Sequence, residues 1–236
     1  LQGQDQGEFK PSGKVWGLAF TDFFWKASGD TATWASKAEY SGVPEDVDAF
    51  ALRRAYLGYD YQWSPIFSAS VILEGNDGIT ATRGDRTVTI KSLRARWKDV
   101  YPNADLLFGQ IPTFAYTFII EKVWGYRSVE KTILDQRGLR SSSDLGVSLM
   151  GKLDSLGMTG YNIMIANGAG TKPEELTQNG KHKIYSGEFY SYLLDKKLVL
   201  DLYTDFQTGL NDHSVLTLKG FVGLQLPALT VGAEVF

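Results

Sequence analysis

Hydrophobic and polar residues alternate along eleven segments of the chain. In residues 198–207, Leu200 and Leu202 alternate with Asp201 and Tyr203, and residues 214–226 repeat this pattern. A period of two residues is typical of a β-strand whose two faces meet different surroundings. The expected strands are residues 13–26, 49–63, 66–74, 87–98, 104–110, 144–153, 158–167, 183–194, 197–209, 214–226 and 228–236.

The connections between these segments alternate between short and long. The short ones are 64–65, 99–103, 154–157, 195–196 and 227, and the long ones are 27–48, 75–86, 111–143, 168–182 and 210–213. Transmembrane barrels have this asymmetry, whereas a soluble β-sandwich has long loops at both ends. Most segments are close to the roughly 9–11 residues that a tilted strand needs to cross a bilayer. The pattern therefore predicts an all-β, transmembrane, antiparallel up-and-down barrel of the outer-membrane porin type.

Composition narrows this prediction without deciding it. The 236 residues are 43% hydrophobic, contain no cysteine and carry a net charge of -3, which is too small to indicate a nucleic-acid partner. No run of 18 apolar residues occurs, so the sequence predicts no transmembrane helix. The polar start LQGQDQGEFK fits a processed N-terminus, and residues 1–12 are expected to form a periplasmic tail.

The connection at 111–143 is long for a compact domain, and ordered loops of this length are usually functional. Within residues 111–142, five basic residues face three acidic ones, Glu121, Glu130 and Asp135, which leaves two positive charges in excess. The segment is therefore a candidate for a loop that constricts a channel. The alternative is that its charges form salt bridges that hold the loop folded. The constriction candidates are Lys122, Arg127, Lys131, Arg137 and Arg140.

Alternation along the strands assigns further charged residues to the lumen. The pore-lining candidates are Arg54, Arg94, Arg96, Lys152 and Lys219. Rings of basic residues favour anions in a pore. Acidic residues on the same face oppose them, so we expect at most a mild anion preference; these are Asp60, Glu74, Glu188, Asp201, Asp205 and Glu234. Arg53 falls on the lipid-facing row near a loop, where it is expected to reach lipid headgroups.

Several stretches resemble the phosphate-selective porin family, in particular its Bacteroidetes-type members. They are FALRRAYLGYDYQWSPIFSASVILEG at 50–75, FGQIPTF at 108–114, EKVWGYRSVEK at 121–131, SSSDLGVSLMGKL at 141–153 and ANGAG at 166–170. The resemblance implies a channel in the outer membrane of a Gram-negative bacterium. It also implies contact with outer-membrane lipid, passage of small hydrophilic or anionic solutes, a homotrimer, and a long loop folded into the lumen. The lysine-rich stretches of phosphate-specific members are missing, and Ile111 and Pro112 stand where many members carry a lysine.

The number of strands bears on the size of the barrel. An up-and-down barrel that begins and ends in the periplasm needs an even number, and a sixteen-stranded one would need roughly 340 residues at the spacing seen here. We therefore expect residues 1–236 to be a single barrel domain that belongs to a larger barrel of roughly 16 strands. The terminal Phe236 favours the opposite interpretation, because the resemblance leads us to expect an aromatic residue at the end of a complete barrel.

Other functional classes have weaker sequence support. His182 and His213 have no serine or carboxylate partner at a catalytic spacing, and no metal-ligand spacing occurs, so neither an enzyme nor a cofactor is expected. A barrel enzyme of the outer-membrane phospholipase kind and a soluble β-sandwich remain as alternatives. A further alternative is a structural barrel with a plugged lumen that binds partners within a larger envelope complex. The bulky inward residues Trp16, Phe20 and Phe24 favour that last interpretation.

Overall fold

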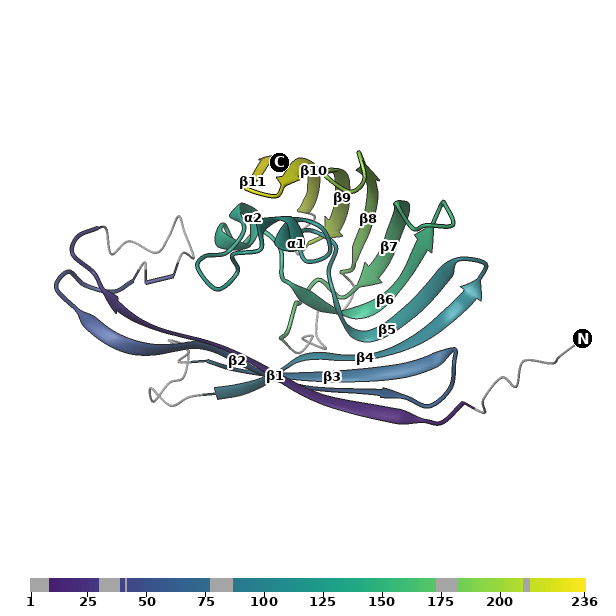
Figure 1. Ribbon diagram of the computed structural model, residues 1–236, viewed down its shortest axis with the longest axis horizontal. Coiled ribbons are helices and arrows are strands. Elements are labelled where there is room, and N and C mark those ends of the chain that lie inside the picture. Colours follow the sequence, from purple (N-terminus) through teal and green to yellow (C-terminus); the bar gives the residue numbers. More distant parts are fainter. Residues whose placement is uncertain (1–8, 30–38, 41, 77–86, 173–181, 210–212) are drawn as a thin grey trace, which may run out of the picture.

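The computed structural model describes residues 9–29, 39–40, 42–76, 87–172, 182–209 and 213–236, so residues 1–8 of the expected periplasmic tail lie outside the described part. Eleven antiparallel strands form one sheet in chain order (Figure 1). The eleven predicted strands are confirmed, with ends that differ by three residues at most. The strands are β1 (Ser12–Trp25), β2 (Asp48–Gln62), β3 (Phe67–Asn76), β4 (Thr87–Tyr101), β5 (Ala104–Pro112), β6 (Ser143–Lys152), β7 (Thr159–Ala166), β8 (Ile184–Leu193), β9 (Leu198–Thr208), β10 (Ser214–Leu226) and β11 (Leu229–Val235).

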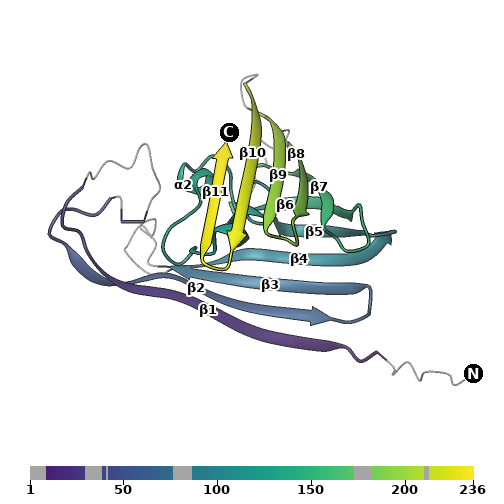
Figure 2. The same cartoon turned by 45° about the horizontal axis from the view of Figure 1, so that its top comes forward.

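The sheet curls strongly along its length. In Figures 1 and 2 the strands from β5 onward bend away from β1–β4, so that β10 and β11 return above the first strands. Within the described residues β1 pairs only with β2 and β11 only with β10, so the sheet is open. Two short helices, α1 (Ile120–Trp124) and α2 (Ile133–Gln136), lie on its concave side.

Neither of these helices, the two that occur in the described residues, is long and apolar enough to cross a membrane.

The two faces of the sheet are exposed in the opposite way to those of a soluble protein, in which apolar side chains are buried and charged ones are exposed. On β9, Leu202 and Phe206 of the convex face are 60% and 42% exposed, whereas Asp201 and Asp205 of the concave face are buried. A soluble protein would bury the leucine and expose the carboxylates. The face assignment made from alternation in β9 and β10 is confirmed by this burial pattern.

Two β-bulges change which side chains face inward. The pairing of β1 with β2 shifts between Phe20 and Thr21 and leaves Arg53 as an extra residue, and the pairing of β3 with β4 leaves Lys91 in the same position. A bulge re-aims a side chain because it breaks the strict alternation of the strand. The expectation that Arg53 reaches lipid headgroups is therefore wrong: its side chain is 7% exposed and contacts the inside of the molecule.

Candidate functional site

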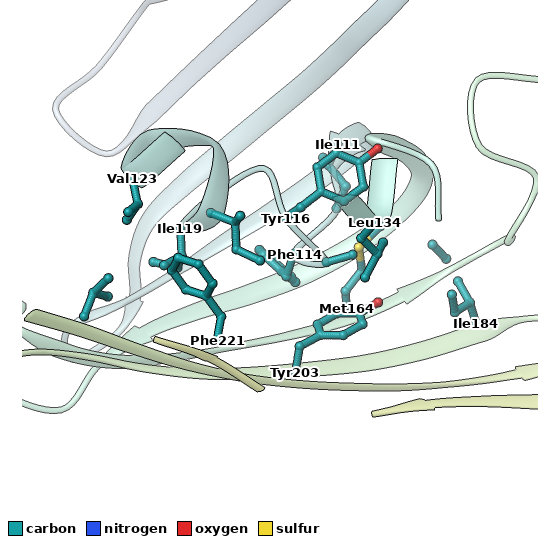
Figure 3. Packing of buried hydrophobic residues seen from close by; sticks show 14 of the residues in the cluster. Ile111, Phe114, Tyr116, Ile119, Val123, Leu134, Met164, Ile184, Tyr203 and Phe221 are labelled. Atoms are coloured by element: carbon teal, nitrogen blue, oxygen red, sulfur yellow. The ribbon is translucent and has the colours of Figure 1, made fainter. Parts of the chain in front are cut away.

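The connection between β5 and β6 folds back onto the concave face of the sheet. We call residues 113–142, which include α1 and α2, the inner segment. Its apolar residues form a cluster with inward-facing residues of β7, β9 and β10, and Figure 3 shows Phe114 and Ile119 directed toward Met164, Tyr203 and Phe221. Phe114 and Leu134 have no exposed surface. The inner segment is thus packed on the wall formed by the later strands of the sheet.

A buried lysine fastens the beginning of the inner segment to the sheet. The Nζ of Lys219 donates a hydrogen bond to the carbonyl oxygen of Ala115 at 2.6 Å and pairs with Asp201 at 2.7 Å. The side chains of Lys219 and Asp201 have no exposed surface. Lys219 faces inward, as alternation predicts, but the inner segment covers it. The expectation that Lys219 lines an open pore does not fit this burial, because a covered ammonium group does not meet a passing solute.

Further basic side chains fasten the rest of the segment. Arg53 donates hydrogen bonds to the carbonyl oxygens of Ser128 and Val129, and Lys91 donates to Ser142 Oγ at 2.6 Å. At the end of the segment, Arg140 pairs with Asp205 of β9 and donates to Thr217 Oγ1 at 2.7 Å. The hydrogen bond to Asp205 raises the pKa of Arg140 further above its ordinary value.

Two other constriction candidates also form ion pairs. Arg127 contacts Glu121 at 3.1 Å and Asp135 at 2.9 Å, both within the inner segment. Burial raises the pKa of Glu121, and the nearby Arg127 partly offsets this rise. Lys131 pairs at 3.4 Å with Glu39 of the connection between β1 and β2. Arg127 and Lys131 therefore hold the loop structure together, which is the alternative weighed for them from the sequence.

The last two constriction candidates are exposed. The Nζ of Lys122 lies 5.7 Å from the centre of the Phe118 ring, which is within the range of a cation–π contact. Arg137 follows α2 at the surface of the segment. Lys122 and Arg137 are thus the two constriction candidates whose side chains meet solvent most fully.

A cavity of about 490 Å³, lined by both charged and apolar residues, lies between the inner segment and the first strands of the sheet. Phe118 contributes to it from the inner segment, and Asp60, Arg94 and Arg96 contribute from β2 and β4. Arg96 pairs with Asp105 of β5, whereas Arg94 has no ion pair with any described residue. Arg94 and Arg96, two of the predicted pore-lining residues, thus lie at the same cavity.

The remaining pore-lining candidates lie elsewhere. Arg54 lies 3.8 Å from Glu39 and 4.0 Å from Glu74, in a network of charges near the long-loop end of β2. Lys152 is exposed at the short-turn end of β6. Sequence reasoning missed Lys91, which pairs with Glu74 at 3.1 Å. The signal that could have found it is its position on the apparent lipid row of β4, where a charge is costly unless a bulge turns it inward.

The described residues contain no group of three or more histidine, cysteine or acidic side chains placed to hold a metal ion. His182 precedes β8 and His213 precedes β10, and each adjoins a part of the chain outside the described residues.

Comparisons with known proteins bear on the fold. The chain matches a crystal structure of the outer membrane channel DcaP of Acinetobacter baumannii with a TM-score of 0.59. The fold is that of an outer-membrane porin. The match covers 97% of this chain and 64% of that channel, so the chain spans less than two thirds of the channel's length, and the sequence identity is 12%. Identity this low shows the fold alone.

A search of protein-family models and a search of curated proteins found no match. The structural match supports the porin-like fold expected from the sequence. The narrower assignment to the phosphate-selective porins has no support from the two sequence searches.

Proposed function

We propose that this protein forms part of a water-filled channel for the passive diffusion of small hydrophilic solutes across the outer membrane of a Gram-negative bacterium. One observation carries the proposal: an inner segment fixed on the concave face of a porin-type sheet leaves a cavity of about 490 Å³ beside it, lined in part by charged residues. A loop placed in this way narrows a pore to the size of small molecules. The larger barrel of roughly 16 strands and the homotrimer belong to this proposal.

The apolar convex face fits a lipid environment. Aromatic residues are exposed near both ends of the strands, among them Trp63 and Trp97 beside short turns and Trp25 and Tyr185 toward the long loops. Tryptophan and tyrosine are enriched at membrane interfaces because their rings are apolar and carry a polar group. This arrangement supports contact with outer-membrane lipid.

A mild anion preference is the finer part of the proposal. Arg94 and Arg96 face the cavity, and the resemblance to the phosphate-selective porins agrees with a preference for anions. Asp105 neutralises much of the charge of Arg96, and Asp60 lines the same cavity, so the preference is expected to be small. Phosphate selectivity is not part of the proposal, since the lysine cluster of phosphate-specific members is missing.

The proposal is tested by measuring the reversal potential of the protein in a planar bilayer under a salt gradient. Wild-type protein is expected to give stepwise conductance with a weak anion preference, and the double variant Arg94→Glu/Arg96→Glu is expected to prefer cations. A matched control is Lys98→Glu, which changes an exposed charge near the turn after β4. Stepwise conductance with unchanged selectivity in the double variant would keep the channel and reject the role of the two arginines.

A second candidate function is a structural barrel with a plugged lumen that binds partners in a larger envelope complex. The observation in its favour is the dense packing of the inner segment, which covers Lys219 completely. The same bilayer experiment separates the two functions, because a plugged barrel that is correctly folded and inserted gives no conductance.

A further inference from the structure

Besides the paired Arg96 and Asp105, the cavity beside the inner segment is lined by charges of both signs that form no ion pair with each other. Register places Lys14, Asp60, Ser70 and Arg94 in one row across β1, β2, β3 and β4, and Gly109 of β5 completes the row. Neighbouring strands are about 4.8 Å apart, so Asp60 and Arg94 lie on strands about 10 Å from each other, with only a serine between them.

Arg94 has unused capacity to bind a negatively charged group. It is half-buried, and no ion pair or hydrogen bond joins its guanidinium to a described residue. Its neighbour on β3, Ser70, is 8% exposed, and its hydroxyl has no hydrogen-bond partner among the described residues. A buried hydroxyl without a partner is costly and does not neutralise the charge beside it, so the guanidinium of Arg94 remains the group placed to receive a ligand oxygen.

Asp60 has unused capacity of the opposite kind. Its Oδ2 accepts a hydrogen bond from Trp16 Nε1 at 2.8 Å, and the described structure gives it no ion pair. Lys14 lies opposite on β1, is exposed, and likewise forms no ion pair with the described residues. The second arginine of the cavity, Arg96, is already matched by Asp105. Among the charged residues that line the cavity, those without an ion pair to a described residue are therefore one carboxylate, one guanidinium and the exposed Lys14 at the rim.

We infer that this cavity binds small zwitterions, molecules that carry both a carboxylate and an ammonium group, such as amino acids and short peptides. The carboxylate of the solute contacts Arg94, and its ammonium group contacts Asp60. A simple anion satisfies Arg94 but is repelled by Asp60. Leu107, Phe118 and Met150 provide apolar surface for the carbon chain, and the volume suits a small organic molecule.

This inference rests on the proposed channel function, so the experiment measures both. Liposomes that contain the purified protein are exposed to arabinose, 5-aminopentanoate or pentanoate, and the rate of swelling is recorded. We expect 5-aminopentanoate to enter about threefold faster than pentanoate, the size of effect that one partly exposed ion pair provides.

Two variants test the assignment of the charges. Asp60→Asn is expected to remove the advantage of 5-aminopentanoate by raising the entry of pentanoate, while Arg94→Gln is expected to slow the entry of both. The matched control is Asp195→Asn in the exposed turn between β8 and β9, which should leave all three rates unchanged.

The outcomes separate the two proposals. Arabinose entry without a preference for the zwitterion, or a preference that survives in Asp60→Asn, would overturn the inference and leave the channel in place. Failure of arabinose to enter liposomes that contain folded protein would overturn the channel itself.

Discussion

Three basic side chains of the sheet hold the inner segment by donating hydrogen bonds to its backbone and side-chain oxygen atoms. Lys219 and Arg53 donate to backbone carbonyl groups, and Lys91 donates to a serine hydroxyl. A segment with only two short helices leaves many carbonyl groups without a partner in its own backbone. Long side chains with several N–H groups supply those partners from strands that lie far apart in the sequence.

Lys219→Met tests the most buried of these contacts. The substitution leaves the buried carboxylate of Asp201 without its cation, so the free energy of unfolding is expected to fall by about 3 kcal/mol or more. Urea unfolding in lipid vesicles, followed by tryptophan fluorescence, measures the change. Lys197→Met changes an exposed lysine and should be nearly neutral. Equal stability of the two variants would show that the Lys219–Asp201 pair does not fasten the segment.

A pH dependence is expected from Glu39, which joins the connection after β1 to the inner segment. Burial raises its pKa, but Lys131, Arg53 and Arg54 outweigh burial, and the pKa lies below its ordinary value. Because the folded-state pKa is depressed, the stabilisation is complete above the unfolded-state pKa and is lost as the pH falls through the folded-state pKa.

The variant Glu39→Gln measures this effect directly. At pH 7 the variant is expected to be less stable than wild type by up to about 1 kcal/mol, and the difference should disappear at an acidic pH below the folded-state pKa of Glu39. Urea unfolding at the two pH values provides the comparison. A difference that persists unchanged at low pH would mean that the side chain acts by packing and not through its charge.

At the scale of elements, strands and local folds differ in what the sequence reveals. Period-two alternation located all eleven strands, because each strand separates two unlike surroundings at every second residue. The bulges at Arg53 and Lys91 could not be read in this way, since one added residue interrupts the alternation without altering composition. The coverage of Lys219 was equally hidden, because it depends on a contact with Ala115 that the local pattern does not contain.

The two ends of the inner segment lie close to each other, so a short linker can replace the residues between them. The ends are joined by a hydrogen bond from the N–H of Thr113 to the carbonyl oxygen of Ser142 at 3.1 Å. Replacing residues 114–141 with a short glycine–serine linker is therefore expected to leave the sheet intact and to raise the single-channel conductance. A planar bilayer recording checks this. Unchanged conductance in a folded variant would mean that the segment does not limit the flow of ions.

At the scale of the whole molecule, the exposed apolar face of the sheet indicates contact with lipid on the convex side, and the polar face indicates water on the concave side. Leu202 lies in the middle of β9 on the convex face and is 60% exposed. In lipid, Leu202→Arg is expected to cost about 2–4 kcal/mol, whereas Leu194→Arg, in the turn before β9, should cost about 1 kcal/mol or less. Unfolding in vesicles measures both costs. Equal costs would argue that the convex face does not meet the bilayer core.

The contact between Lys219 and Ala115 joins residues 104 positions apart in the sequence. Closing such a distant contact is slow, because the intervening chain must be ordered before the contact forms. The inner segment is therefore synthesised before its anchor on β10, whereas its anchors Arg53 on β2 and Lys91 on β4 precede it in the chain. We therefore expect the packing of the segment against β9 and β10 to be a late event of folding, and the narrowing of the concave side to be completed only then.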